Sequence, residues 1–187
     1  VTTEGVYLGR RIVIGLYNLY ANRYDNIKQF DAFSEDVYLA RPILHMIPQV
    51  RAPLVLDVAT GGGHTALKFA PHVNKVIATD LTPKMLAAAQ KFAEGQGVTN
   101  VMFEPADAEA LPFDDANFDL VTCRLAFHHF PNPRQAVAEF ARVLKSGGRL
   151  AVSDIVTDGP LPDEIKSSLS AWAGCVAGAL DVKDYIA

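Results

Sequence analysis

The chain has 187 residues, of which 50% are hydrophobic and 20% charged, and its formal net charge is −4. This length predicts one domain with a sizeable core, and the apolar content excludes a disordered chain. A mildly acidic chain without a clustered basic face argues against a nucleic-acid partner. The apolar stretch of residues 12–21 is far shorter than the ~18–20 residues that a membrane span needs.

The chain contains two cysteines, Cys123 and Cys175, and they do not form a CxxC pair. A disulfide framework or a zinc knuckle is therefore unsupported, and a reducing cytoplasmic location is the expectation. The adjacent histidines His128 and His129 lack a third ligand at suitable spacing. We therefore predict no metal site.

Residues 1–50 carry tyrosines and apolar side chains at helical spacing. This spacing predicts two or three short helices, which we expect to form a lid on the domain of residues 51–187. A tyrosine can line an apolar wall and still donate a hydrogen bond, although packing on the sheet is the alternative for each ring. The tyrosines considered for the lid are Tyr17, Tyr20, Tyr24 and Tyr38.

Strand and helix patterns alternate from Pro53 onward. Short apolar segments predict strands at residues 54–58, 75–80, 100–104, 118–123 and 149–155. One helical pattern ends near residue 70, and three more span residues 83–94, 134–144 and 162–180. Thr82 before Pro83 fits a helix start, and Gly147-Gly148 is expected to end the third of these helices. The pattern predicts an α/β, Rossmann-like doubly wound fold, with a mostly parallel sheet covered by helices on both faces.

A glycine-rich turn follows the first predicted strand. Gly61-x-Gly63-x-x-Ala66 satisfies the dinucleotide-binding pattern, and Asp80 lies where an acid would bind ribose hydroxyls. Such a turn lets the backbone approach a ligand closely and directs helix N–H groups toward it. This pattern alone fits a nicotinamide enzyme as well as any other enzyme that binds a nucleoside.

Two further acids favour one class of ligand. Asp57, at the end of the first strand, suits a ligand that carries an ammonium group and would repel a pyrophosphate. Asp107, after the third strand, could accept a hydrogen bond from an adenine amino group. A Tyr-x-x-x-Lys match at Tyr24 and Lys28 precedes the glycine turn, where short-chain dehydrogenases do not place it. A nicotinamide oxidoreductase is therefore the disfavoured alternative.

Five ordered segments carry a family resemblance: residues 55–63, 78–86, 107–113, 118–130 and 142–150. Together they resemble the class I S-adenosylmethionine (SAM)-dependent methyltransferases, in the small-molecule group that includes the ubiquinone and menaquinone methyltransferases. The resemblance implies SAM as the cofactor and S-adenosylhomocysteine (SAH) as its product. It also implies direct in-line transfer of a methyl group to a small acceptor, because the protein mainly aligns the nucleophile and excludes water. A homologue that binds the cofactor without catalysis is an alternative.

The resemblance also implies roles for individual residues. The turn of Ala59, Thr60 and Gly61 to Gly63 would pass beneath the methionine moiety, and Asp57 would hold its ammonium group. Asp80 would contact the ribose, and the backbone of Arg124 would contact the methionine end. The adenine would be contacted by Leu81, Asp107 and Ala108. Ala59 departs from the family, which usually has glycine there. Alanine is suitable only if the backbone at this position avoids positive φ.

Two side chains are the catalytic candidates. His128, after the fourth strand, could act as a base or contact the substrate, because imidazole titrates near neutral pH. The alternative is that His128 only lines the pocket while His129 orders the loop. Tyr24 is a candidate cofactor or substrate contact by resemblance only.

The last part of the chain is unusual in two ways. Residues 170–180 resemble the segment that follows the fifth strand in arsenite methyltransferases, where a cysteine binds the metalloid, and Cys175 would be the matching residue. A buried structural cysteine is the favoured interpretation. Family members normally end with two more strands, which are missing here. The chain is therefore either truncated or leaves the fifth strand as an exposed edge, which would favour a homodimer.

Overall fold

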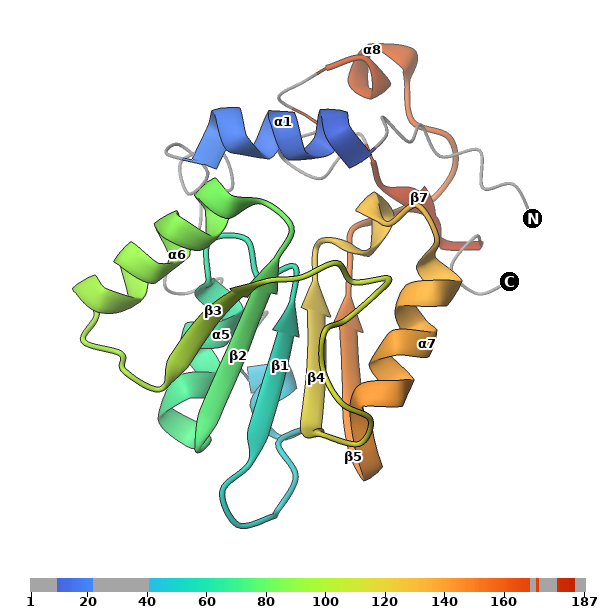
Figure 1. The fold of residues 1–187 in the computed structure, drawn as a ribbon. Coiled ribbons are helices and arrows are strands. Elements are labelled where there is room, and N and C mark those ends of the chain that lie inside the picture. Colours follow the sequence, from blue (N-terminus) through green and yellow to red (C-terminus); the bar gives the residue numbers. More distant parts are fainter. Residues whose placement is uncertain (1–9, 22–40, 169–170, 172–177, 184–187) are drawn as a thin grey trace.

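A computed structural model describes residues 10–21, 41–168, 171 and 178–183 of the chain. Its centre is a five-stranded sheet in the order β3-β2-β1-β4-β5, and all neighbouring strands are parallel (Figure 1). The strands are β1 (Leu54–Val58), β2 (Lys75–Asp80), β3 (Val101–Pro105), β4 (Phe118–Arg124) and β5 (Leu144–Ser153). The order reverses between β1 and β4. The α/β doubly wound fold expected from the sequence is confirmed.

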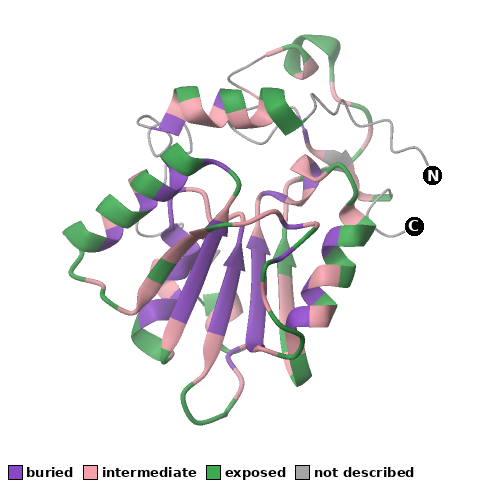
Figure 2. Ribbon diagram, viewed as in Figure 1, coloured by how far each residue is buried: buried purple, intermediate pink, exposed green. Residues whose placement is uncertain are grey.

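The three inner strands are buried on both faces, as their continuous apolar sequences predict. β1, β2 and β4 are almost entirely buried, whereas the edge strands β3 and β5 alternate between partly buried and exposed residues (Figure 2). The core therefore lies around β1 and sits directly below the carboxyl ends of the strands. The buried strands therefore fix the positions of the residues that follow their carboxyl ends.

Side chains of β1 alternate between two cores. Leu56 and Val58 pack with α7 (Pro133–Val143) on one face, where Phe140 is fully buried. Val55 packs on the other face with Phe69 of α5 (His64–Phe69) and with residues of α4 (Arg41–Leu44). Helices thus cover both faces of the sheet, because successive strand side chains point to opposite sides.

Helix α6 (Pro83–Gly95) begins as the sequence predicts, with Thr82 at the N-cap and Pro83 in the first turn. The Thr82 side chain makes no capping hydrogen bond. Instead, the backbone carbonyl of Thr82 accepts a hydrogen bond from the amide of Met85 at 3.0 Å. Short 3-10 turns, η3 (Ala70–His72) and η4 (Phe127–His129), follow α5 and β4.

The C-terminal part differs from the prediction. β5 begins at Leu144 rather than at residue 149, so Gly147 and Gly148 lie inside the strand, where the pairing with β4 is irregular. Gly147 has φ 79°, which glycine adopts readily, so the pair accommodates an irregularity inside the strand instead of ending a helix. The helix expected over 162–180 is not continuous: its first turn, α8 (Asp163–Lys166), ends before Ser167, and residues 169–170 and 172–177 lie outside the described residues. Ser167 after it bonds the backbone of Glu164, and such serine bonds compete with helix propagation.

A separate two-stranded parallel pair, β6 (Val156–Thr157) and β7 (Leu180–Asp181), was not predicted. Within the described residues, β5 is the edge of the main sheet. Cys175 lies outside these residues. No helix among them is long and apolar enough to cross a membrane.

Helix α1 (Arg10–Tyr20) lies across the carboxyl ends of the strands (Figure 1). Of the tyrosines expected to line a pocket, Tyr17 does so, whereas Tyr20 packs with Leu16 and Ala171. Tyr24 and Tyr38 lie outside the described residues. Of the described helices in residues 1–50, the segment expected to form the lid, α1 lies over the ends of the strands, whereas α4 packs in the core with Val55 and Phe69.

Candidate functional site

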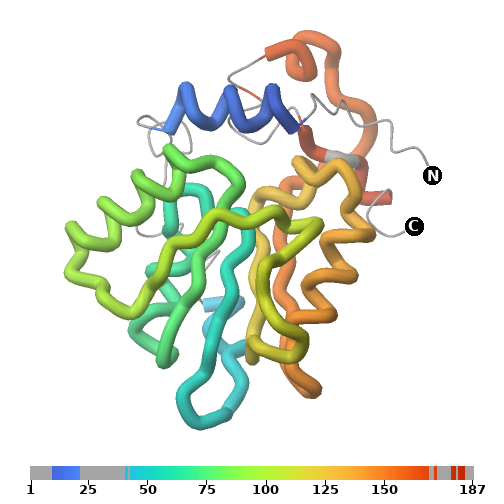
Figure 3. The backbone as a smooth tube through the Cα atoms, viewed as in Figure 1, coloured from blue at the N-terminus to red at the C-terminus, as the bar shows by residue number. Residues whose placement is uncertain are grey.

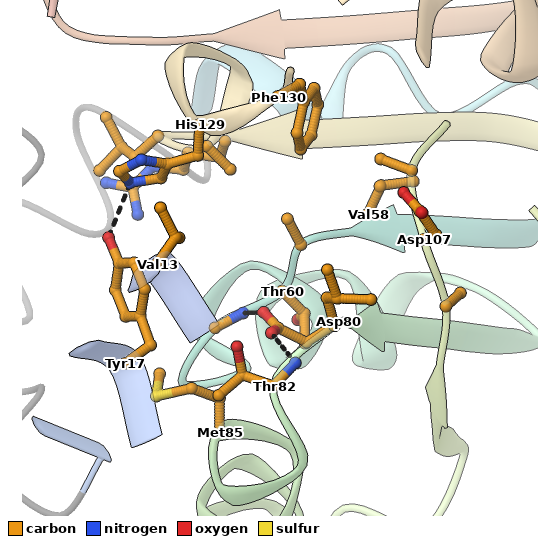
Figure 4. A pocket seen from close by; sticks show the side chains of 18 of the residues that line it. Val13, Tyr17, Val58, Thr60, Asp80, Thr82, Met85, Asp107, His129 and Phe130 are labelled. Carbon is orange, nitrogen blue, oxygen red and sulfur yellow. Dashed lines mark hydrogen bonds between the residues drawn. The ribbon is translucent and has the colours of Figure 1, made fainter. Parts of the chain in front are cut away.

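A pocket lies between α1 and the carboxyl ends of β1, β2 and β4 (Figure 4). Its volume, counted together with the open space at its mouth, is about 1050 Å³. The site residues expected from the resemblance that line it are Asp57, Ala59, Thr60, Gly61, Asp80, Leu81, Asp107, Ala108 and Arg124. The strand order reverses at this point, where open α/β sheets bind ligands.

The glycine turn between β1 and α5 is held from both sides. The Gly61 amide donates to Asp80 Oδ2 at 3.0 Å, and the Thr60 amide donates to the Thr79 carbonyl at 2.8 Å. Gly63 caps α5 with φ 83°, and a Cβ there would approach the Cβ of Ala89 at 3.0 Å. Glycine at 63 therefore allows both the left-handed turn and the close approach of α6.

Ala59 adopts φ 54° in the same turn. The condition under which alanine is unstrained at this position, a negative φ, is therefore not met. A left-handed backbone at a non-glycine residue costs about 1–2 kcal/mol. The chain tolerates this strain inside the candidate site, next to Asp57.

Asp57 is buried at the end of β1 and forms part of the pocket lining. Burial raises its pKa to about 6, and this shift is opposed by hydrogen bonds from Thr60 Oγ1 at 2.6 Å and Thr122 Oγ1 at 2.7 Å and by the charge of Arg124. The two hydroxyls orient both carboxylate oxygens. A carboxylate whose ionised form is disfavoured by burial is suited to a cationic ligand group.

Asp80 ends β2 and binds two backbone amides. Its Oδ2 accepts from Gly61, and its Oδ1 accepts from Thr82 at 2.8 Å. Burial raises the pKa of this carboxyl despite these hydrogen bonds. Asp80 thus joins the glycine turn to the start of α6, so it has a structural role in addition to the predicted ligand contact.

Asp107 follows β3 and is bound by a residue that the sequence analysis did not consider. Arg10 of α1 lies 2.6 Å from Asp107 Oδ2 and 3.2 Å from Glu109 Oε2. The Glu109 amide donates to the other Asp107 oxygen at 3.0 Å. Only the tertiary packing of α1 reveals Arg10, because nothing in the local sequence links it to residue 107.

The two histidines exchange the places that the alternative interpretation gave them, in which His128 lines the pocket and His129 orders the loop. His128 is buried, with its Nδ1 at 2.7 Å from Asp154 Oδ1 and its amide bonded to Asp154 Oδ2 at 3.0 Å. His129 lines the pocket instead. Thus His128 anchors the loop after β4 and His129 faces the ligand space, because Asp154 at the end of β5 fixes the direction of the first ring.

His129 is also joined to α1. Its Nε2 lies 2.8 Å from the Tyr17 hydroxyl, and the two rings meet edge to face (Figure 4). In the same view this pair lies on the side of the pocket opposite Asp107, with Asp80 between them. The polar groups are therefore distributed along the whole length of the pocket.

The described residues contain no cluster of three or more metal-ligating side chains. Cys123 is a buried free thiol in β4, and burial, together with Asp154 and Asp57, raises its pKa well above the ordinary value. It therefore stays a neutral packing residue and does not present a thiolate ligand.

Residues 56–152 match the family model described as "Methyltransferase domain". This match covers more than half of the chain. The chain belongs to the methyltransferase-domain family. Its fold and motifs are those of the class I SAM-dependent group, as the sequence resemblance implied.

Two curated relatives support this assignment of the methyltransferase domain. It is 48% identical over 117 residues to an uncharacterized methyltransferase of Bacillus subtilis, YcgJ, covering 62% of this chain and 46% of that protein. It is 38% identical over 140 residues to a demethylmenaquinone methyltransferase of Thermus thermophilus, covering 73% and 63%. The domain therefore spans roughly half to two thirds of the length of these two relatives.

Solved structures give the same fold. The Bacillus YcgJ structure matches with a TM-score of 0.66 at 35% identity, covering 79% of this chain and 64% of that chain. A [4+2]-cyclase, SpnF, matches with a TM-score of 0.72 at 22% identity, covering 84% and 65%. Because the fold also supports a cyclase, the activity of the methyltransferase domain has to be argued from its site.

Proposed function

We propose that this domain binds SAM and transfers its methyl group to a small-molecule acceptor by direct in-line displacement. The observation that carries the proposal is that one pocket is lined by Asp57, Asp80 and Asp107, whose carboxylates lie at or just after the ends of β1, β2 and β3. One ligand with an ammonium group, ribose hydroxyls and an adenine amino group supplies a donor to each. A dinucleotide would place its diphosphate beside Asp57, where like charges repel.

The residues of the turn fit such a ligand. Gly61 lines the pocket and, without a Cβ, lets a ligand approach the backbone closely, and a ligand ammonium group would add a positive charge beside the buried Asp57 carboxylate. Leu81 is 37% exposed and lies in the pocket lining, which suits a flat apolar base. SAM supplies a methyl group on a positively charged sulfur, so the protein needs to orient the reactants and exclude water. Val13 of α1 and Phe130 add apolar walls to the pocket.

We assign the acceptor to the end of the pocket that holds Tyr17 and His129. If Asp107 binds the adenine and Asp80 the ribose, the reacting methyl group lies toward the opposite side, where this pair is located (Figure 4). An acceptor proton would pass to the Tyr17 oxygen while the Tyr17 hydroxyl proton passes to Nε2 of His129. His129 thus replaces His128 as the proposed base, and His128 orients the loop.

The experiment is to incubate the purified domain with SAM and a panel of small acceptors, and to measure SAH together with the methylated product. We expect transfer to at least one acceptor. Tyr17→Phe and His129→Gln should lower kcat about 10²-fold or more while the Kd for SAH changes little. SAH binding without transfer to any acceptor would contradict catalysis and favour a cofactor-binding protein without activity.

A further inference from the structure

The loop that carries Asp107 is fixed at its far end by two side chains of α7. Glu139 Oε2 accepts from the Leu111 amide at 2.8 Å, and Arg142 Nη2 donates to the Leu111 carbonyl at 2.9 Å. Arg142 Nη1 also donates to the Phe113 carbonyl at 2.7 Å and to Asp115 Oδ1 at 2.8 Å. The loop backbone is therefore held by side chains rather than by a neighbouring strand.

Glu139 and Arg142 also bind each other in a two-pronged ion pair. Arg142 Nε donates to Glu139 Oε1, and Nη2 donates to Oε2, both at 2.8 Å. The hydrogen bonds from Arg142 lower the pKa of Glu139, and those to Glu139 and Asp115 raise the pKa of Arg142. With these contacts every N–H donor of the guanidinium is used, and lysine cannot reproduce this planar arrangement.

The same loop has a second anchor at its beginning. The Ala106 amide donates to the carbonyl of Asp80 at 3.3 Å, at the end of β2. Residues 107–110 therefore bridge two fixed points, β2 on one side and the Glu139–Arg142 pair on the other. Figure 3 shows the segment crossing above the strands and then descending beside α7. Asp107 and Ala108, which line the pocket, lie inside this short bridge.

We propose that Glu139 and Arg142 are positioning residues that set the domain's preference for adenine. The inference rests on the proposed function, in which Asp107 accepts a hydrogen bond from the adenine amino group, and on Ala108 as the second adenine contact that the family resemblance implies. A hydrogen-bonding edge distinguishes adenine from hypoxanthine only if its acceptor and donor are held in place, since hypoxanthine presents a carbonyl where adenine presents an amino group. Neither side chain lines the pocket, so each acts through the loop.

The test compares binding of SAH and S-inosylhomocysteine by calorimetric titration of the purified chain, together with its thermal unfolding. We expect the unmodified chain to prefer SAH by about tenfold or more. Arg142→Lys and Glu139→Gln should reduce this preference to about threefold or less, chiefly by weakening SAH binding. Thermal unfolding identifies any variant that fails to fold.

A matched control is Lys145→Met. Lys145 Nζ binds both oxygens of Asp119 at 3.0 and 2.9 Å, but this ion pair lies at the start of β4, away from the pocket. Its loss should lower the unfolding temperature and leave the adenine preference unchanged. Folded Arg142→Lys and Glu139→Gln variants that keep the full preference would overturn the inference. An unmodified chain that binds neither ligand would instead overturn the proposed function, and one that binds both equally would overturn only the role of the loop.

Discussion

At the scale of single residues, the most unusual backbone in the site belongs to Ala59. Its φ of 54° lies in the region that favours glycine. We predict that Ala59→Gly raises the free energy of unfolding by about 1 kcal/mol, because relief of the left-handed strain exceeds the entropy that glycine adds to the unfolded chain. Urea denaturation of both proteins measures this change.

The control for this substitution is Ala87→Gly. Ala87 lies on the exposed side of α6, in ordinary helical backbone. Glycine there should lower the free energy of unfolding by about 0.5–1 kcal/mol. Destabilisation by both substitutions would show that residue 59 carries no strain worth removing.

Asp57 makes ligand binding depend on pH. Its pKa of about 6 in the folded chain means that the carboxylate is mostly protonated at pH 5 and mostly ionised at pH 7. A ligand ammonium group requires the ionised form, so we predict that SAH binds about tenfold more weakly at pH 5 than at pH 7. In Asp57→Asn this dependence should disappear, and affinity should be weak at both values. An unchanged pH profile in the variant would exclude Asp57 as the ammonium partner.

The same raised pKa makes the folded chain less stable as the pH rises, whereas ligand binding becomes stronger over the same range. Because folding raises the pKa from 3.8 to about 6, the folded chain binds the proton more tightly than the unfolded chain between these values. The contribution of Asp57 to the free energy of unfolding is therefore complete below pH 4 and is lost as the pH rises through 6. Relative to Asp57→Asn, the unmodified chain should lose about 2–3 kcal/mol over this range in urea denaturation.

At the scale of elements, α1 is fastened at both ends. Arg10 binds Asp107 and Glu109 at one end, and Tyr17 binds His129 toward the other. We predict that Arg10→Ala speeds amide hydrogen exchange in residues 10–20 by about three- to tenfold, since a partly buried charged pair of this kind holds the helix against the loop.

Arg11 supplies the matched variant for this experiment. It is adjacent in sequence and exposed. Arg11→Ala should leave the exchange rates of α1 close to those of the unmodified chain. Equal effects of both variants would show that general charge, rather than the contacts of Arg10, governs the helix.

β1, β2, β4 and α6 could be predicted from the sequence because their signals are local: continuous apolar runs for the three strands, and Thr82 before Pro83 for α6. The glycine turn could be located for the same reason. The roles of His128 and His129 could not be separated, because Asp154 determines which ring turns inward. The role of the Glu139–Arg142 pair could not be predicted either, because the loop residue that both side chains bind lies about 30 residues away along the chain.

At the scale of the whole molecule, the edge strand β5 is the feature that bears on association. Val152 is 41% exposed on this strand, which ends the main sheet within the described residues. An edge strand can pair with a second copy of the chain, so we predict a dimer that forms as concentration rises. Light scattering across a concentration series measures this, and a constant monomer mass would contradict it.

The pocket is proposed to bind an adenosyl ligand with an ammonium group rather than a dinucleotide. The most direct measurement is calorimetric titration of the purified chain with SAH, with NAD as the comparison ligand. We predict SAH binding with a dissociation constant on the order of micromolar and no binding of NAD, because only NAD carries a diphosphate to the position beside Asp57. Binding of NAD without SAH, or of neither ligand, would contradict the proposal that this pocket binds SAM.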